Sequence, residues 1–115
     1  MSTQPPAFGV RARAVERAHV VAPVGEVDLF SADEVRAALA LRPKECDVVV
    51  LDLRELTFFD TSGMRLVVET FQELAGTSTR FAILRGSADV QRPFAIARLE
   101  DRLPFFDDLD GALAA

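Results

Sequence analysis

The first part of the chain alternates between apolar and polar residues in the pattern of two short strands. From Phe8 the even-numbered positions are apolar or alanine, whereas Arg11 and Arg13 occupy the odd positions between them. A period of two is typical of a half-exposed strand. A second apolar stretch covers residues 19–24, and the polar residues between the two stretches predict a hairpin whose second strand ends at Gly25.

The pattern then changes to helical spacing and back to that of a strand. Ser31 with Glu34 three residues later forms the pattern of a capping box, and apolar residues at helical spacing follow until Pro43. Residues 48–53 are almost continuously apolar, which predicts a central strand that is covered on both faces.

A loop over residues 54–60 is predicted to lead into a second helix, which Gly76 is well placed to end. The apolar residues of this helix recur at intervals of three and four, as expected for one buried face. They are Met64, Val67, Val68, Phe71 and Leu74.

The remaining pattern predicts a strand over 81–84, a third helix entered through Ser87, a short strand at 105–106 and a last helix over 108–114. The predicted order is β-β-α-β-α-β-α-β-α. Alternation after an opening hairpin indicates an α/β fold, with a mixed β-sheet of about five strands and about four helices packed against it.

Length and composition support one folded domain. The chain has 115 residues, of which 50% are hydrophobic, so one core is feasible and general disorder is excluded. We expect residues 1–7 to be a flexible N-terminal lead-in and residues 8–115 to form the domain. The single cysteine, Cys46, cannot form an internal disulfide or a zinc site, and an ordinary structural thiol is expected.

Charge and hydropathy narrow the classes of partner and compartment. Asp and Glu outnumber Lys and Arg by 18 to 13, which disfavours nucleic acid as a partner. The N-terminus lacks the pattern of a signal peptide, and the longest aliphatic run, 48–51, is too short to span a bilayer. These features predict a cytoplasmic protein with no membrane partner.

The most informative chemistry lies at the predicted start of the second helix, in Asp60-Thr61-Ser62-Gly63. Asp60 and Thr61 are favourable capping residues. The first turn of a helix presents unpaired N–H groups and the positive end of its dipole, so an anion on Ser62 would be tolerated there. The lack of a side chain at Gly63 is expected to let another protein approach the hydroxyl. Alone, these four residues also fit a common turn and cap.

Two motifs at the right separation make the chain similar to the STAS family, the sulfate-transporter and anti-sigma-antagonist domain. The first is Leu51-Asp52-Leu53, then Phe58-Phe59, then Asp60-Thr61-Ser62-Gly63-Met64. The second is Gly25-Glu26-Val27-Asp28, which matches the family's Gly-Glu-Leu-Asp before a helix. With the closing segments 103–106 and 108–113, the resemblance covers roughly Phe8 to Leu113. Two motifs in the right order are more specific than either alone.

The resemblance implies an anti-sigma factor antagonist without enzymatic activity. In such members the serine before the motif glycine is phosphorylated, which is Ser62 here, with Thr61 as the alternative acceptor. The kinase is the anti-sigma factor itself, a histidine-kinase-like ATPase, and a serine phosphatase is expected to reverse the modification. The unphosphorylated form binds this partner and frees a sigma factor.

The resemblance also places a partner-binding surface on this chain. Its expected residues are Asp28, Asp60, Thr61, Ser62, Gly63 and Met64. Thr61 and Met64 stand where Ser and Leu are commoner in the family. Arg54 and Glu55 add charge to the preceding loop and are expected to influence the choice of partner.

The sequence offers less support for an enzyme, a nucleotide-binding protein or a metal-binding protein. A serine hydrolase would need a base beside Ser62, but the only histidine, His19, lies on a predicted strand. A nucleotide pocket would need a glycine-rich phosphate loop, and the acids at 107–110 are better explained as a cap and solvated charge than as a metal site. No cofactor is therefore expected. The closest alternative is a STAS subunit of another machine, such as a lipid-transport complex or a stress-signalling scaffold.

Overall fold

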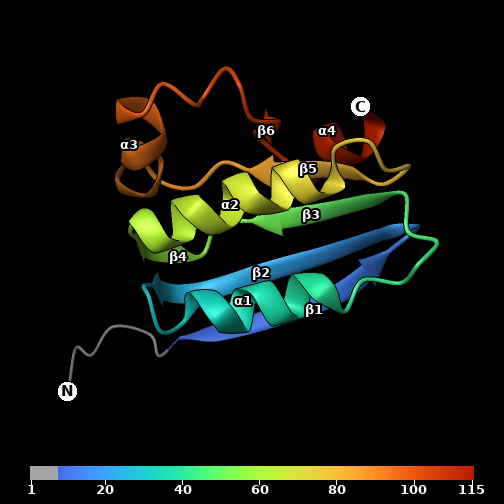
Figure 1. Cartoon of the computed structure of the whole chain (residues 1–115), viewed down its shortest axis with the longest axis horizontal. Helices are drawn as coiled ribbons and strands as arrows, with labels where there is room; N and C mark the ends of the chain where they lie inside the picture. Colours follow the sequence, from blue (N-terminus) through green and yellow to red (C-terminus); the bar gives the residue numbers. More distant parts are fainter. Residues whose placement is uncertain (1–7) are drawn as a thin grey trace.

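The computed structural model describes residues 8–115, so the lead-in predicted over 1–7 lies outside the described residues. The elements are β1 (Gly9–Val15), β2 (Ala18–Val27), α1 (Ala32–Ala40), β3 (Val48–Asp52), β4 (Leu56–Phe59), α2 (Thr61–Leu74), β5 (Arg80–Leu84), α3 (Ala88–Ile96), β6 (Phe105–Phe106) and α4 (Leu109–Ala114). The α/β class and the mixed sheet with four helices are confirmed (Figure 1).

The strands form one sheet in the order β1-β2-β3-β5-β6, and β4 pairs with β2 outside this path. Only β1 is antiparallel to its neighbour, and the other pairs are parallel. Strand β4 is an addition to the prediction, which assigned 54–60 to a loop. The strand forms because β2 continues past Gly25, where a positive φ of 91° and a shift of register turn the strand toward β4. The prediction that β2 ends at Gly25 was therefore wrong.

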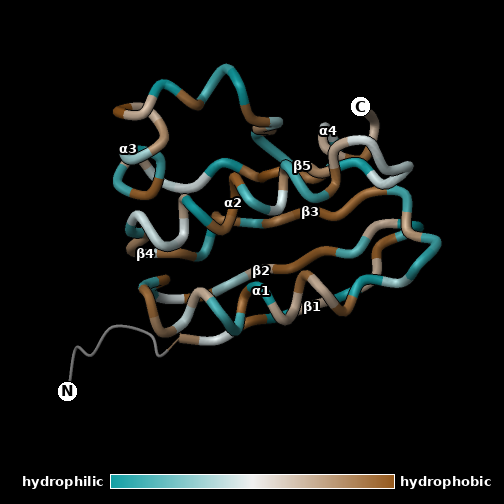
Figure 2. Tube along the Cα trace, in the orientation of Figure 1, coloured by the Kyte–Doolittle hydropathy of each residue, from teal (hydrophilic) through white to brown (hydrophobic). Residues whose placement is uncertain are grey.

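The sheet has two differently covered faces. Val49 and Leu51 belong to the larger core, which α1, α2 and α3 cover, whereas Val48 and Val50 face a smaller core beneath α4. Every residue of β3 is buried, which confirms a central strand covered on both sides. In Figure 2 the central strand β3 carries hydrophobic colours along most of its length.

Helices α1 and α2 lie side by side on the larger face and begin at the same end of the sheet (Figure 1). One ion pair joins them directly, Arg36 to Glu69 at 2.8 Å, and a second, Arg42 to Glu73 at 3.4 Å, joins the segment just after α1 to α2. Because both residue numbers increase together, the helices run parallel. Their N-terminal ends are therefore neighbours, and these ends carry the two predicted family motifs.

The capping box predicted for Ser31 and Glu34 is not formed. Ser31 precedes α1, but its hydroxyl caps no helical N–H. The hydroxyl instead accepts from the Asp28 N–H at 2.8 Å and lies 3.1 Å from the Glu26 carbonyl oxygen. The prediction was wrong because a nearer backbone partner in the preceding loop competes for the same hydroxyl.

The buried face of α2 differs in part from the predicted one. Leu66 and Thr70 are buried, whereas Val68 is half-buried and Phe71 is exposed. Thr70 was overlooked as a polar residue, but its hydroxyl donates to the Leu66 carbonyl oxygen at 2.8 Å and so can be buried. The helix ends at Leu74 and Gly76 follows with a φ of 82°, which confirms the predicted stop.

Candidate partner-binding site at the start of α2

Ser62 lies in the first turn of α2, and Asp60 caps that turn. The Asp60 carboxylate accepts hydrogen bonds from the N–H groups of Ser62 at 2.8 Å and Gly63 at 3.3 Å. The Asp60 N–H donates to the Val27 carbonyl oxygen at 3.2 Å, which ties the helix start to the end of β2. The predicted cap is confirmed, and it holds the half-buried Ser62 at the surface.

A hollow of about 460 Å³ opens beside Ser62, between the N-terminal halves of α1 and α2. Its lining contains Thr61 and Ser62 together with Leu29 from the loop before α1. Two arginines, Arg36 and Arg65, also line it. Sequence reasoning missed both arginines, because the position of Arg36 depends on the pairing of two helices.

Asp28 lies in the loop between β2 and α1, where its carboxylate has a structural role. It accepts from the N–H groups of Phe30 at 2.9 Å and Ser31 at 3.0 Å. The hydrogen bond from the Ser31 N–H, with further help from the Ser31 hydroxyl and the Phe30 N–H, lowers the pKa of Asp28 below its ordinary value. Asp28 therefore keeps this loop folded beside the start of α2.

Gly63 and Met64 both have structural roles, and their expected contact with a partner stays a prediction. Gly63 is buried, and a Cβ added to it would overlap the ring of Phe59. The missing side chain therefore makes room for the core, which corrects the idea that it opens a path to the Ser62 hydroxyl. Met64 is half-buried and packs against the larger core. Thr61, in contrast, is exposed beside Ser62.

Exposed apolar side chains surround this helix end. Leu29 and Phe30, directly after Asp28, are 68% and 85% exposed. A second hollow of about 530 Å³, which Met64 lines, also has Phe58 and Ile96 in its lining, and both of these are exposed. Apolar residues gathered on a surface favour contact with another protein. The sequence signal for this exposed surface is the apolar pair Leu29 and Phe30, which stands between Asp28 and the start of α1.

His19 is a structural residue at the far end of β2. It is buried, and its Nε2 donates to the Ala38 carbonyl oxygen at 2.9 Å. Eight residues of strand, or about 26 Å, separate it from Val27, which adjoins the Asp60 cap. His19 therefore cannot act as a base for Ser62.

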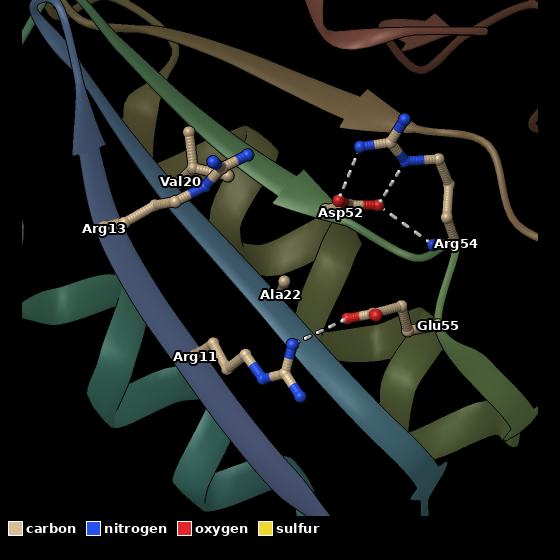
Figure 3. A pocket seen from close by; sticks show the side chains of 7 residues that line it. All are labelled: Arg11, Arg13, Val20, Ala22, Asp52, Arg54 and Glu55. Atoms are coloured by element: carbon tan, nitrogen blue, oxygen red, sulfur yellow. Dashed lines mark hydrogen bonds and ion pairs between the residues drawn. The ribbon is translucent and has the colours of Figure 1, made fainter.

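Arg54 and Glu55 lie on the sheet face opposite α1 and α2, in a hollow that Figure 3 shows. Arg54 holds the buried Asp52 carboxylate through two contacts of 3.0 Å, and Asp52 raises the pKa of this guanidinium. Glu55 lies 3.9 Å from Arg11 of β1. Arg54 and Glu55 thus each pair with another residue of the same chain, and their expected influence on the choice of partner stays a prediction.

Comparison with known proteins identifies the family. Residues 10–112 match the family model of the STAS domain, and the chain belongs to that family. An anti-sigma-B factor antagonist of Listeria monocytogenes is 31% identical over 78 residues, which cover 67% of this chain and 68% of that protein. Within residues 8–115, no helix is long and apolar enough to cross a membrane.

Solved structures share the fold. An anti-sigma factor antagonist from Mycobacterium paratuberculosis matches with a TM-score of 0.84 and 24% identity, over 94% of this chain and 92% of that one. The anti-sigma factor antagonist SpoIIAA in its unphosphorylated form matches with a TM-score of 0.73 and 22% identity, over 92% and 93% of the two chains. Bacillus SpoIIAA in its phosphorylated form gives a TM-score of 0.68 and 21% identity, over 94% and 96%.

Proposed function

We propose that this chain is an anti-sigma factor antagonist that binds an anti-sigma factor while Ser62 is unphosphorylated and releases it after phosphorylation. The observation that carries the proposal is the position of Ser62, half-buried in the first turn of α2 at the edge of a surface hollow. The antagonists among its relatives support it. We further propose that the chain is cytoplasmic and has no catalytic activity of its own.

The proposed partner surface joins the loop before α1 to the first turn of α2, at one end of the larger face. Asp28 holds this loop, and Leu29 and Phe30 extend from it with most of their surface exposed. Thr61 and Ser62 supply the second part. Large apolar side chains at the centre of an interface contribute most of its binding energy, and the surrounding polar groups provide orientation.

The proposed modification is a phosphoryl transfer from ATP, catalysed by the anti-sigma factor acting as a serine kinase. Ser62 Oγ bonds to the γ-phosphorus, and the bond from that phosphorus to the β,γ-bridging oxygen breaks. ADP leaves, and the hydroxyl proton passes to a base of the kinase. A serine phosphatase restores the hydroxyl by transferring the phosphoryl group to water.

Charge explains how this modification would release the partner. A phosphoserine carries about −1.5 to −2 charge at neutral pH. In a closed interface that charge loses its water and interacts unfavourably with any facing carboxylate or nucleotide phosphate. Each 1.4 kcal/mol of penalty is about tenfold in affinity, so a local effect is sufficient and no refolding of the domain is required.

The first prediction concerns the acceptor. After incubation with the cognate kinase and ATP, mass spectrometry should locate the phosphate on Ser62. Ser62→Ala should abolish the modification, whereas Thr61→Ala, the matched control on the neighbouring hydroxyl, should retain it. Phosphate on Thr61, or on a residue away from α2, would contradict the assignment.

Isolation of the proteins that bind this chain distinguishes an anti-sigma factor antagonist from a STAS subunit of another complex. A chain carrying a C-terminal affinity tag should retain a histidine-kinase-like ATPase from its own cells, and the Ser62→Asp variant should retain less. Retention of transporter components by both forms would instead assign the chain to a transport complex.

A further inference from the structure

The cap of α2 creates an electrostatic problem for a phosphate on Ser62. Asp60 already accepts from the N–H groups of Ser62 and Gly63, so two donors of the first turn are engaged. The same carboxylate puts a negative charge at this helix end, which offsets the attraction of the dipole for a second anion. A phosphate on Ser62 therefore needs cationic partners from elsewhere in the chain.

Two guanidinium groups are placed to supply them. Arg65 follows Ser62 by three residues on α2, so the two side chains start on the same helix face, with Cβ atoms about 5–6 Å apart. Arg36 approaches from α1 and lines the same hollow as Ser62 and Arg65. In the unmodified chain Arg36 pairs with Glu69 at 2.8 Å and lies 3.4 Å from Asp33.

We propose that Arg36 and Arg65 form a clamp that holds the phosphate of phosphorylated Ser62, with Arg36 exchanging Glu69 for the phosphate. The proposal rests on the proposed function in taking Ser62 as the acceptor. The clamp draws the phosphate into the hollow between α1 and α2 and joins the two helices at their N-terminal ends. Phosphorylation then changes the shape and charge of the partner surface without changing the fold.

The exchange takes place among charged groups of both signs. The acidic groups are Asp33 and Glu69 along the hollow and Asp60 at the helix cap, and the basic groups are Arg36 and Arg65. A phosphate dianion presents three acceptor oxygens and up to twice the charge of a carboxylate. Guanidinium groups bind carboxylate and phosphate alike through two parallel N–H donors, so the larger charge of the phosphate makes it a stronger partner than Glu69. The Arg36 side chain is 44% exposed and has room to turn.

The chain provides a matched control for Arg36. Arg42, two residues after the end of α1, makes a second pair with α2, to Glu73 at 3.4 Å, and it is not part of the lining of the Ser62 hollow. Arg36→Gln and Arg42→Gln each remove one ion pair to α2, but only the former removes a proposed phosphate ligand. The comparison therefore separates phosphate binding from helix packing.

The test uses the full chain with phosphoserine incorporated genetically at position 62, so that it depends on neither kinase nor partner. The second pKa of the phosphate, ordinarily about 6, is measured by ³¹P NMR titration. A nearby cation favours the dianion and lowers this pKa, so Arg36→Gln and Arg65→Gln should each raise it by about one unit relative to the phosphorylated parent. Arg42→Gln should leave it unchanged.

Lysine variants separate a direct clamp from a general positive field. Arg36→Lys and Arg65→Lys keep the charge but lose the planar fork, so they should restore only part of the shift. Full restoration by lysine, or equal pKa values in Arg36→Gln and Arg42→Gln, would overturn the clamp. Amide spectra of the unphosphorylated variants verify that each is folded. If Arg36→Gln does not fold, the phosphate pKa of Arg65→Gln tests the clamp instead. A failed clamp leaves the acceptor assignment standing, because mass spectrometry tests that separately.

Discussion

At the scale of single residues, Asp28 connects local geometry with pH. Hydrogen bonds from the Ser31 and Phe30 N–H groups stabilise its carboxylate and lower its pKa below the ordinary 3.8. A lowered pKa in the folded state means that the contribution to stability is present above pH 3.8. It is lost as the pH falls through the lower folded value.

The loop hydrogen bonds of Asp28 determine what its variants should do. Asp28→Ala removes the acceptor of the loop hydrogen bonds and should loosen Leu29 and Phe30, so weaker partner binding would report on loop order as well as charge. Asp28→Asn keeps one acceptor oxygen and removes the charge. Acid titrations of unfolding below pH 4 should lose part of their slope in both variants. An unchanged slope in Asp28→Asn would contradict the role of the charge.

Residues with one dominant local partner were predictable, and those with competing partners were not. Asp60 was predicted as a cap and is one, because its carboxylate lies within reach of the next N–H groups along the chain. Ser31 is an equally suitable capping residue, but its hydroxyl accepts a hydrogen bond from the Asp28 N–H instead. Position 63 requires a glycine because the ring of Phe59 occupies the space of a side chain. The spacing of residues along α2 does not reveal this contact.

At the scale of elements, periodicity located most helices and strands and failed where tertiary contacts decide. Strand β4 is four residues long and exists through its pairing with the end of β2. Nothing in the spacing of its own residues distinguishes it from a loop. The face of α2 was misjudged in part because hydrophobicity favoured Val68 and Phe71 over Thr70, whose hydroxyl is satisfied within the helix.

The corrected face of α2 gives a prediction about stability. Leu66 is 1% exposed, whereas Val68 is half-buried. Leu66→Ala should lower the free energy of unfolding by about 2–5 kcal/mol, since it removes buried carbons and leaves a cavity. Val68→Ala, the matched control on the same helix, should cost about 1 kcal/mol or less. Urea unfolding of both variants measures the difference, and equal losses would contradict the observed face.

At the scale of the whole molecule, the two sheet faces separate two groups of charges. On one side, the parallel helices α1 and α2 begin at the same end of the sheet (Figure 1). This brings together Asp28, in the loop before α1, and Ser62, in the first turn of α2, although the two residues are far apart in sequence. On the other side, Arg54 and Glu55 pair with Asp52 and Arg11 (Figure 3). The sheet lies between Arg54 and the helix side that holds the proposed partner surface.

Partner affinity measured in both phosphorylation states tests the central claim most directly. Isothermal titration calorimetry would compare the unphosphorylated chain and the chain with phosphoserine at 62 against one purified histidine-kinase-like anti-sigma factor. The account predicts that phosphorylation weakens binding by at least about tenfold, which corresponds to 1.4 kcal/mol. Equal dissociation constants for the two forms, in chains with the same amide spectra, would contradict it.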